Sequence, residues 1–512
     1  MKKSNKSLIS NSLFLNAKTL VVLIVTLYTS RILLNEMGVV DFGLYNVIGG
    51  VVATLSFLTS SMALATQRFV AYDLGKNDHS RIKNIYSTSL NIYISIIVLI
   101  FLFGVTVGKW FVSEKLSIPI DRYDAAVNVY YVTIVTFSLS VLCIPFNAFL
   151  ISYEKFKLIT VIGIIEVMLK LLLIISMEFF DCDKMIYYSI IMLIVSMSVF
   201  LMNYLCFRIS IQGVNYSISF DLELTRKMLS YTGWNLLGNV SWVAFSQGTN
   251  ILINVFFGPS VNASRAIAYQ VTSALNNFSK SITTAINPQI VKKHSSGNSS
   301  SAEILILNGA KYSFFFIFLL SAPIIMNIEF VLKFWLGQVP DYAAIFCLFV
   351  IVDANILALS STLTAGVQAT GKVKYFQIFE SIFTLMNIPV SYYFLFNGAE
   401  AQVVFVVMIF FSLILLSSRL LFAKYLIDLS LSKFLGQVIS KSILVVTISS
   451  VFASTMGIFG SASFFEFIVK SMIVSFLIII TIYFFGLDKK EKVMFKNILN
   501  GFLGKFYSYV TK

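Results

Sequence analysis

Long apolar segments follow one another along almost the whole chain, separated only by short polar connections. About fourteen of them reach the ~20 residues that an α-helix needs to cross a hydrocarbon core. Lipid offers the backbone no hydrogen-bond partners, so segments of this length are expected to form spanning helices. With 58% hydrophobic and 12% charged residues and a mean hydropathy of +0.86, the composition excludes an ordinary soluble protein. The sequence therefore predicts an all-α polytopic membrane protein with about 14 transmembrane helices.

The spans predicted for the first half are 8–34, 43–65, 85–108, 125–150, 158–177 and 185–207. Those of the second half are 228–257, 261–286, 304–328, 343–363, 375–396, 401–421, 434–459 and 464–485. The first segment is longer than the apolar core of a signal peptide, so we expect it to be retained as a spanning helix. The segments at 228–257 and 261–286 are the most polar.

Lysine and arginine gather in every second connection. Basic connections contain Lys76, Lys155 and Lys372, for example, whereas the intervening ones contain Asp121 and Asp341. Because cytoplasmic loops carry an excess of Lys and Arg, both termini are predicted to be cytoplasmic. Membrane orientation thereby accounts for the net charge of +14, and no nucleic-acid partner is expected.

The two halves of the chain contain matching segments. Gly38 aligns with Gly258 at a shift of 220 residues (258 minus 38), and Glu154 aligns with Gly371 at a shift of 217 (371 minus 154). Six spans per half preserve orientation, so helices 1 to 6 and 7 to 12 are predicted to form a parallel repeat with a cleft between two lobes. The predicted organisation is an N-lobe at 1–210, a cytoplasmic linker at 211–227, a C-lobe at 228–427, two extra helices at 428–487 and a basic tail at 488–512. Apolar residues on one face of that tail suit a helix lying on anionic lipid, and a frayed basic tail is the equal alternative.

Polar residues recur at helical spacing along two consecutive spans. The first stripe contains Asn235, Asn239, Trp242, Ser246 and Asn250; the second contains Arg265, Thr272, Asn276, Ser279 and Thr283. Polar side chains in a spanning helix are costly unless they line an aqueous cavity or pair across helices. The stripes therefore indicate a transport pathway, with hydrogen bonding between helices as the alternative.

Charged residues inside the spans sharpen this interpretation. Lys18 and Arg31 lie in the first span, and Arg265 and Lys280 in the eighth. If these helices face one cleft, it is electropositive and suits an anionic cargo, since Arg and Lys both bind phosphate. Scattered structural cations are the alternative, and Arg31 lies close enough to a span end to snorkel. Asp353 is a candidate for binding a coupling ion, or else a partner of a nearby cation.

A local pair of opposite charges has a simpler explanation. Glu166 and Lys170 lie one helical turn apart in the fifth span, so they are expected to neutralise each other. Enzyme signatures are missing. The two histidines and four cysteines lie far apart in the sequence, and no phosphate-binding loop occurs. We therefore predict no catalytic residues, no metal site, no disulfide framework and no cofactor.

Two segments carry a family resemblance: TSRILLNEMGVVDFGLYNVIGG (Thr29 to Gly50) and SSMALATQRFVAYDLGKND (Ser60 to Asp78). With these motifs the chain resembles the polysaccharide exporters of the MOP superfamily, specifically Wzx-type O-antigen or capsule repeat-unit flippases. The resemblance implies a MATE-like fold of two six-helix lobes that works by alternating access. It also implies a bacterial inner-membrane protein that moves undecaprenyl-diphosphate-linked oligosaccharide to the periplasmic leaflet, with ion coupling. Membrane lipids, a polysaccharide polymerase and a chain-length regulator are the partners it implies.

The resemblance also suggests where the cargo binds. Lipid II flippases use basic residues on helices 1, 2 and 8; here helix 1 offers Lys18 and Arg31 and helix 8 offers Arg265, but only Arg68 follows helix 2. The full set of candidate cavity residues is Lys18, Arg31, Asn235, Asn239, Asn250, Arg265, Thr272, Asn276 and Lys280.

Two other functions stay open at this point. A MATE-type cation-coupled multidrug exporter would favour an acidic cavity. A membrane polysaccharide polymerase or glycosyltransferase, which is a different class of protein, would be expected to have large periplasmic loops.

Overall fold

The computed structural model describes residues 2–76, 78–217, 221–455, 459–489 and 491–493, and within these ranges every regular element is a helix. Eleven helices of the described residues are long and apolar enough to cross a membrane. Three further long helices, α2, α8 and α9, have more polar sequences. Together they give the predicted number of about fourteen and confirm the all-α polytopic fold.

The described chain forms two compact units, each with its own packing. Unit 1 comprises Met1–Gln270, Trp335–Phe346 and Gln377–Phe411, and unit 2 comprises Val271–Phe334, Cys347–Phe376 and Ser412–Lys512. The lobe boundaries inferred from the sequence repeat stay a prediction. The predicted amphipathic tail lies mostly outside the described residues.

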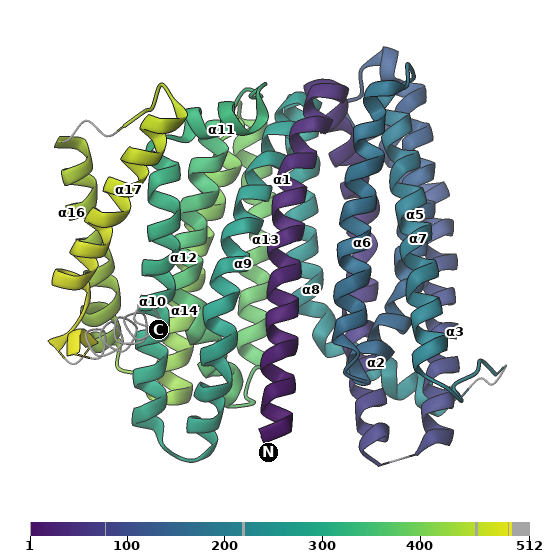
Figure 1. Ribbon diagram of the computed structural model, residues 1–512, viewed down its shortest axis with the longest axis horizontal. Coiled ribbons are helices and arrows are strands. Elements are labelled where there is room, and N and C mark those ends of the chain that lie inside the picture. The colour runs from purple at the N-terminus through teal and green to yellow at the C-terminus, as the bar shows by residue number, and fades with distance from the viewer. Residues whose placement is uncertain (1, 77, 218–220, 456–458, 490, 494–512) are drawn as a thin grey trace, which may run out of the picture. The chain divides into compact units, whose positions relative to one another are not determined.

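Unit 1 contains the first eight helices, longer parts of three later ones and short ends of two more (Figure 1). The helices that lie wholly within it are α1 (Lys2–Ala53), α2 (Phe57–Gly75), α3 (His79–Phe103), α4 (Lys109–Lys115), α5 (Tyr123–Ser152), α6 (Phe156–Ile175), α7 (Lys184–Ser210) and α8 (Leu222–Phe257). It shares α9 (Pro259–Ser295), α13 (Lys374–Phe396) and α14 (Val403–Ile427) with unit 2.

The first two predicted spans are joined by a single residue. Gly38 interrupts α1 with φ 74° and ψ 170°, a conformation that side chains disfavour, and the helix continues through a short 3₁₀ turn into α2. The second span therefore runs over 39–75, longer than the predicted 43–65. Gly258 ends α8 with φ 78° and ψ −176°, and α9 starts at the next residue, Pro259. Proline suits this first helical position because its missing N–H would have no partner there.

The repeat predicted from these glycines extends through the helices that follow. Asp78 caps α3 by accepting a hydrogen bond from Arg81 N, and Asn298 caps α10 by accepting one from Ser301 N, each at a shift of 220 residues. The second predicted match holds as well, because Glu154 (φ 55°) and Gly371 (φ 72°) both adopt positive φ after a helix end. The two sequence offsets therefore pair positions that have the same local conformation, and the repeat of whole lobes stays a prediction.

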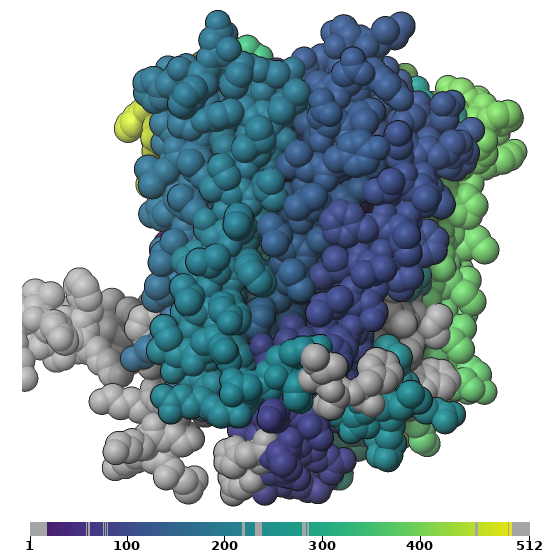
Figure 2. Space-filling model, turned by 90° about the vertical axis from the view of Figure 1, so that its right-hand side faces the viewer, coloured from purple at the N-terminus to yellow at the C-terminus, as the bar shows by residue number. Residues whose placement is uncertain are grey.

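In unit 1, α5 packs against α1, α2, α3 and α7, and α1 also packs along α6. A buried aromatic group ties α3 to α5 and α7, where the Tyr86 and Phe207 rings stack at 4.9 Å and Phe149 meets both. Exposed apolar side chains such as Leu102 and Met197 cover α3 and α7, which occupy much of the face in Figure 2. A continuous apolar exterior is the surface expected to face lipid.

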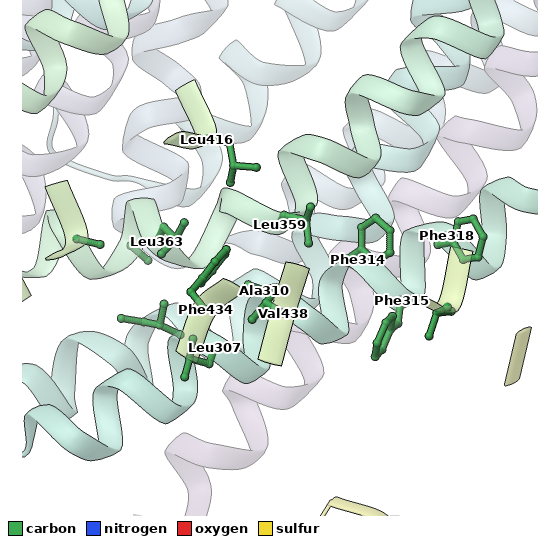
Figure 3. Packing of buried hydrophobic residues seen from close by; sticks show 14 of the residues in the cluster. Leu307, Ala310, Phe314, Phe315, Phe318, Leu359, Leu363, Leu416, Phe434 and Val438 are labelled. Carbon is green, nitrogen blue, oxygen red and sulfur yellow. The ribbon is translucent and has the colours of Figure 1, made fainter. Parts of the chain in front are cut away.

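Unit 2 has a core of aromatic and aliphatic side chains (Figure 3). Its helices are α10 (Ser299–Met326), most of α11 (Ile328–Leu336) and α12 (Ala343–Ala369), α15 (Leu431–Phe434), α16 (Ser440–Thr455) and α17 (Phe464–Thr481). Phe314, Phe315 and Phe318 of α10 belong to the same cluster as Phe434 and Ile478. The two extra helices predicted outside the repeat, α16 and α17, therefore complete this core by packing on α10 and on each other.

Candidate functional site

Arg265 is a buried cation held by neutral groups. It lies two turns into α9 and is only 6% exposed. Its Nη2 donates hydrogen bonds to Ser246 O and, at 3.3 Å, to Thr249 Oγ1 of α8, while the guanidinium lies 4.1 Å from the centre of the Tyr269 ring. Within the described part of the chain, no carboxylate lies within ion-pair distance of Arg265.

The surroundings of Arg265 leave part of its hydrogen-bonding capacity unused. Its Nε is buried and has no partner among the described residues. The space that adjoins the side chain is too narrow to hold a water molecule, and Thr249, Tyr269, Phe405 and Met408 line it. A buried charge that lacks a counter-ion is costly to the fold. The missing negative charge is what an anionic ligand would supply.

Asn250, also predicted for this site, binds neighbouring helices instead. Its Oδ1 accepts a hydrogen bond from Asn262 Nδ2 at 2.8 Å, and its Nδ2 donates to Asn46 O at 3.3 Å. Gly50 leaves room for it, since a Cβ there would fall 2.3 Å from Asn250 Nδ2. The side chain thus joins α1, α8 and α9, which is the interhelical role considered as the alternative for the polar stripes.

Lys18 lies between α1 and α6, in a charge cluster separate from the Arg265 contacts. Its Nζ is 3.5 Å from Ile159 O, and a Cβ at Gly163 would fall 2.1 Å from Lys18 Cε. Glu166 interacts electrostatically with both Lys18 and Lys170. The predicted Glu166–Lys170 pair therefore includes a second cation from another helix, and Lys18 has an acidic neighbour that the sequence spacing did not indicate.

The remaining candidates are spread along their helices. Arg31 is exposed on α1, and Asn239, Thr272 and Asn276 are half-buried on α8 and α9. The side chains of Asn235 and Lys280 lie outside those that the structure describes. We therefore base the candidate site on Arg265 and not on a cluster of the nine predicted residues.

Asp353, the candidate for ion coupling, is buried on α12 in unit 2. Its Oδ1 accepts a hydrogen bond of 2.5 Å from Ser412 Oγ of α14. Arg419, two turns further along α14, is its electrostatic neighbour and donates a 2.6 Å hydrogen bond to Ser360 Oγ. These contacts favour the alternative interpretation, in which Asp353 balances a nearby cation.

The sequence interpretation missed an ion network near the Gly38 turn. Arg122 binds Asp41 through Nε (2.8 Å) and Nη2 (2.5 Å), and its Nη1 lies 2.6 Å from Asp183 Oδ2. The network joins α1, the start of α5 and the N-cap of α7. The available signal was the position of Arg122 between Asp121 and Asp124, because an arginine in acidic surroundings is expected to pair with a carboxylate.

No family model matches the sequence, and neither does any curated protein. Solved structures do match in fold. The inward closed form of the lipid II flippase MurJ superposes with a TM-score of 0.70 at 12% identity and covers 96% of this chain and 100% of its own. An inward-facing MATE multidrug resistance transporter of the MOP superfamily gives a TM-score of 0.64 at 15% identity, covering 79% of this chain and 94% of its own.

A third match is a MOP superfamily transporter from Pyrococcus furiosus, described as having a binding pocket of reversed polarity. Its TM-score is 0.61 at 13% identity, and it covers 83% of this chain and 96% of its own. This chain has the fold of MOP superfamily transporters. Together with the eleven candidate spans, that fold makes it a multi-pass membrane protein whose structural neighbours are transporters and flippases.

The two kinds of neighbouring structure differ in how much of this chain they cover. The MATE match leaves about a fifth of this chain unpaired, whereas the lipid II flippase match leaves 4%. The part of the chain after α14, which holds α16 and α17, is similar in size to the unpaired fifth. The MurJ structure therefore matches a larger part of this chain than the MATE structure does.

Proposed function

We propose that this protein is a flippase that moves undecaprenyl-diphosphate-linked oligosaccharide repeat units from the cytoplasmic to the periplasmic leaflet of a bacterial inner membrane. In this proposal the repeat units serve O-antigen, capsule or exopolysaccharide assembly, and an ion gradient drives the cycle. A polysaccharide polymerase and a chain-length regulator would use the product.

The observation that carries the proposal is the state of Arg265. Its guanidinium is buried, it lacks a carboxylate partner among the described residues, and its Nε has no hydrogen-bond acceptor there. An exporter of cationic drugs would need an anionic site, whereas the positive charge of Arg265 would repel a cationic drug. A diphosphate offers several oxygens to the planar N–H fork of an arginine, and charge-assisted bonds of this kind are among the strongest in proteins.

In the proposed cycle, the phosphorylated headgroup meets Arg265 while the polyprenyl tail stays in lipid. This separation keeps the charge of the headgroup out of hydrocarbon, where it would cost several kcal/mol or more. Exposure of the site then alternates between the two sides of the membrane, as in other transporters built from repeats. The aromatic ring of Tyr269 holds the guanidinium in place through a cation–π contact.

The test is an export assay in cells whose own copy has been deleted. Cells without the protein are expected to accumulate lipid-linked repeat units on the cytoplasmic face, and the wild-type chain should restore export. Arg265→Ala is expected to reduce export about tenfold or more, and Arg265→Lys should retain part of it because the charge stays while the fork is lost. Arg208→Ala, which changes an exposed arginine of α7 bound to Asn215, is the matched control.

Protein level in the membrane is measured for every variant, so that loss of insertion is not mistaken for loss of transport. If Arg265→Ala exports at the wild-type rate while inserted normally, the proposed role of Arg265 is wrong. If deletion leaves no lipid-linked repeat units on the cytoplasmic face, the proposed cargo is wrong.

A further inference from the structure

A groove with a volume of about 720 Å³ lies between α2 and α8 within unit 1. Arg68 and Tyr72 line it from α2, and Glu223, Arg226 and Lys227 line it from the first turns of α8. The two helices pack against each other. The connections that flank the groove belong to the basic side of the sequence, predicted to be cytoplasmic, and its volume is that of a typical small-molecule site.

The lining of the groove is electropositive. It holds three cations and one carboxylate, which leaves a net charge of +2 (three minus one). The single carboxylate, Glu223, is already paired with Lys227 one turn further along α8. Lys76, at the end of α2, adds a further positive charge 4.5 Å from the centre of the Tyr72 ring. An anion is therefore the ligand that this groove favours.

Apolar side chains next to these cations point to the kind of anion. Leu64 lies one turn before Arg68 on α2, and Leu229 lies one turn after Arg226 on α8; both leucines are about half exposed. A soluble phosphate has no apolar part that could contact exposed leucines beside its binding site. An amphiphile would contact both, with its charged headgroup at the arginines and its hydrocarbon chain at the leucines.

We propose that this groove binds the diphosphate headgroup of a polyprenyl-linked cargo on the cytoplasmic side, before the cargo reaches Arg265. Arg68 and Arg226 hold the phosphate oxygens through their planar N–H groups, and Tyr72 packs against the first sugar. The inference rests on the proposed function, and it adds a loading site at the opposite end of α8 from Arg265's partners Ser246 and Thr249.

The test measures equilibrium binding of radiolabelled undecaprenyl diphosphate to the full-length protein in nanodiscs of phosphatidylcholine. The double variant Arg68→Glu/Arg226→Glu is expected to bind about tenfold more weakly or worse, since two charge-assisted contacts become repulsions. Lys372→Glu is the matched control, because it reverses an exposed charge in the connection between α12 and α13. The thermal unfolding temperature of each variant shows whether it is folded.

Two competitors distinguish the sources of the phosphate group. Phosphatidylglycerol in excess is the first competitor. If it displaces the probe as effectively as unlabelled undecaprenyl diphosphate does, the groove is an ordinary phospholipid site and the proposal is wrong. Equal displacement by inorganic pyrophosphate would overturn it in favour of a soluble ligand. Failure of both to compete supports the proposal.

The binding assay and the export assay fail independently. If the folded double variant binds the probe like the wild type while Arg265→Ala still blocks export, the loading site is wrong and the proposed function stands. If the double variant loses the probe but deletion of the protein traps no lipid-linked repeat units, the groove is a polyprenyl diphosphate site and the proposed function is wrong.

Discussion

Lys311 of α10 forms a buried ion pair with Glu491, at the far end of unit 2 in sequence. Its Nζ lies 2.7 Å from both carboxylate oxygens, and the lysine side chain is only 2% exposed. The hydroxyl of Tyr312 donates a 2.8 Å hydrogen bond to the same carboxylate. The segment that follows α17 is thereby fixed to the core helix that α17 packs on.

We expect Lys311→Ala to destabilise unit 2 strongly, because it leaves Glu491 buried without its counter-charge. The expected loss is about 3–5 kcal/mol. Thermal unfolding of the purified protein in detergent measures it. The matched control is Lys433→Ala, whose pair with Glu303 is half exposed and is expected to contribute less than about 1 kcal/mol. Equal effects of the two substitutions would show that burial does not set the strength of the Lys311 pair.

The neighbouring Asp488 gives this region a predicted pH dependence. A hydrogen bond from Lys441 Nζ, 2.5 Å from its Oδ1, lowers the pKa of the Asp488 carboxyl below its usual range. A depressed pKa in the folded state stabilises the fold at pH values above the unfolded pKa of about 3.9, and this contribution is lost as the pH falls through the folded pKa. Because Asp488 is half exposed, we expect an effect below about 1 kcal/mol.

The measurement for Asp488 is the unfolding temperature of the wild type and of Asp488→Asn between pH 7 and pH 3. The wild type is expected to be the more stable at pH 7, and the difference should shrink at the acidic end. A difference that stays constant over this range would contradict the assignment.

Gly43 is predicted to be intolerant of any side chain. A Cβ at this position would fall 1.8 Å from Pro259 O, a backbone atom that cannot move aside without shifting the start of α9. We therefore expect Gly43→Ala to cost about 1–3 kcal/mol through overpacking. Gly49→Ala is the control in the same helix, since nothing lies within 4 Å of its added Cβ. If the two variants unfold at the same temperature, α1 and α9 do not pack as closely as described.

Arg122 is expected to stabilise the end of unit 1 that contains the Gly38 turn. Arg122→Ala leaves Asp41 and Asp183 without their shared partner, so we predict a loss of about 1–3 kcal/mol. Arg122→Lys should recover only part of it, because an ammonium cannot bind two carboxylates through a planar fork. Unfolding temperatures are compared with that of Asp181→Ala, which removes an exposed carboxylate nearby in the sequence. A full recovery with lysine would show that charge alone matters.

The sequence allowed the fold to be predicted because its main signals are local. Apolar length identified the spans, and the alignment of Gly38 with Gly258 found two positions that share a conformation suited to glycine. The second span was predicted too short mainly at its end, because α2 continues to Gly75 through polar residues such as Thr66, Gln67 and Arg68. The boundary between α8 and α9 was predicted to within a few residues, since Gly258 and Pro259 mark it.

The site was only partly predictable, since its contacts join residues far apart in the sequence. Arg265 was chosen as a candidate because a lone arginine in a polar stripe is unusual in a spanning helix, and the structure buries its side chain. The helical spacing predicted that Glu166 pairs with Lys170. It does not indicate that Lys18, which lies on α1, is a neighbour of the same carboxylate. The Arg122 network was missed for the same reason: its three members come from different helices.

The two one-residue junctions at Gly38 and Gly258 also limit how homologous chains can vary in length. Where one helix passes directly into the next, no loop can absorb a change in length. An insertion or deletion there would rotate every following side chain by about 100° around the helix axis. Changes in length must be absorbed elsewhere, such as at residues 211–217 after the end of α7. Segments 29–50 and 250–270 should therefore align without gaps among relatives of this chain, even where few residues are identical.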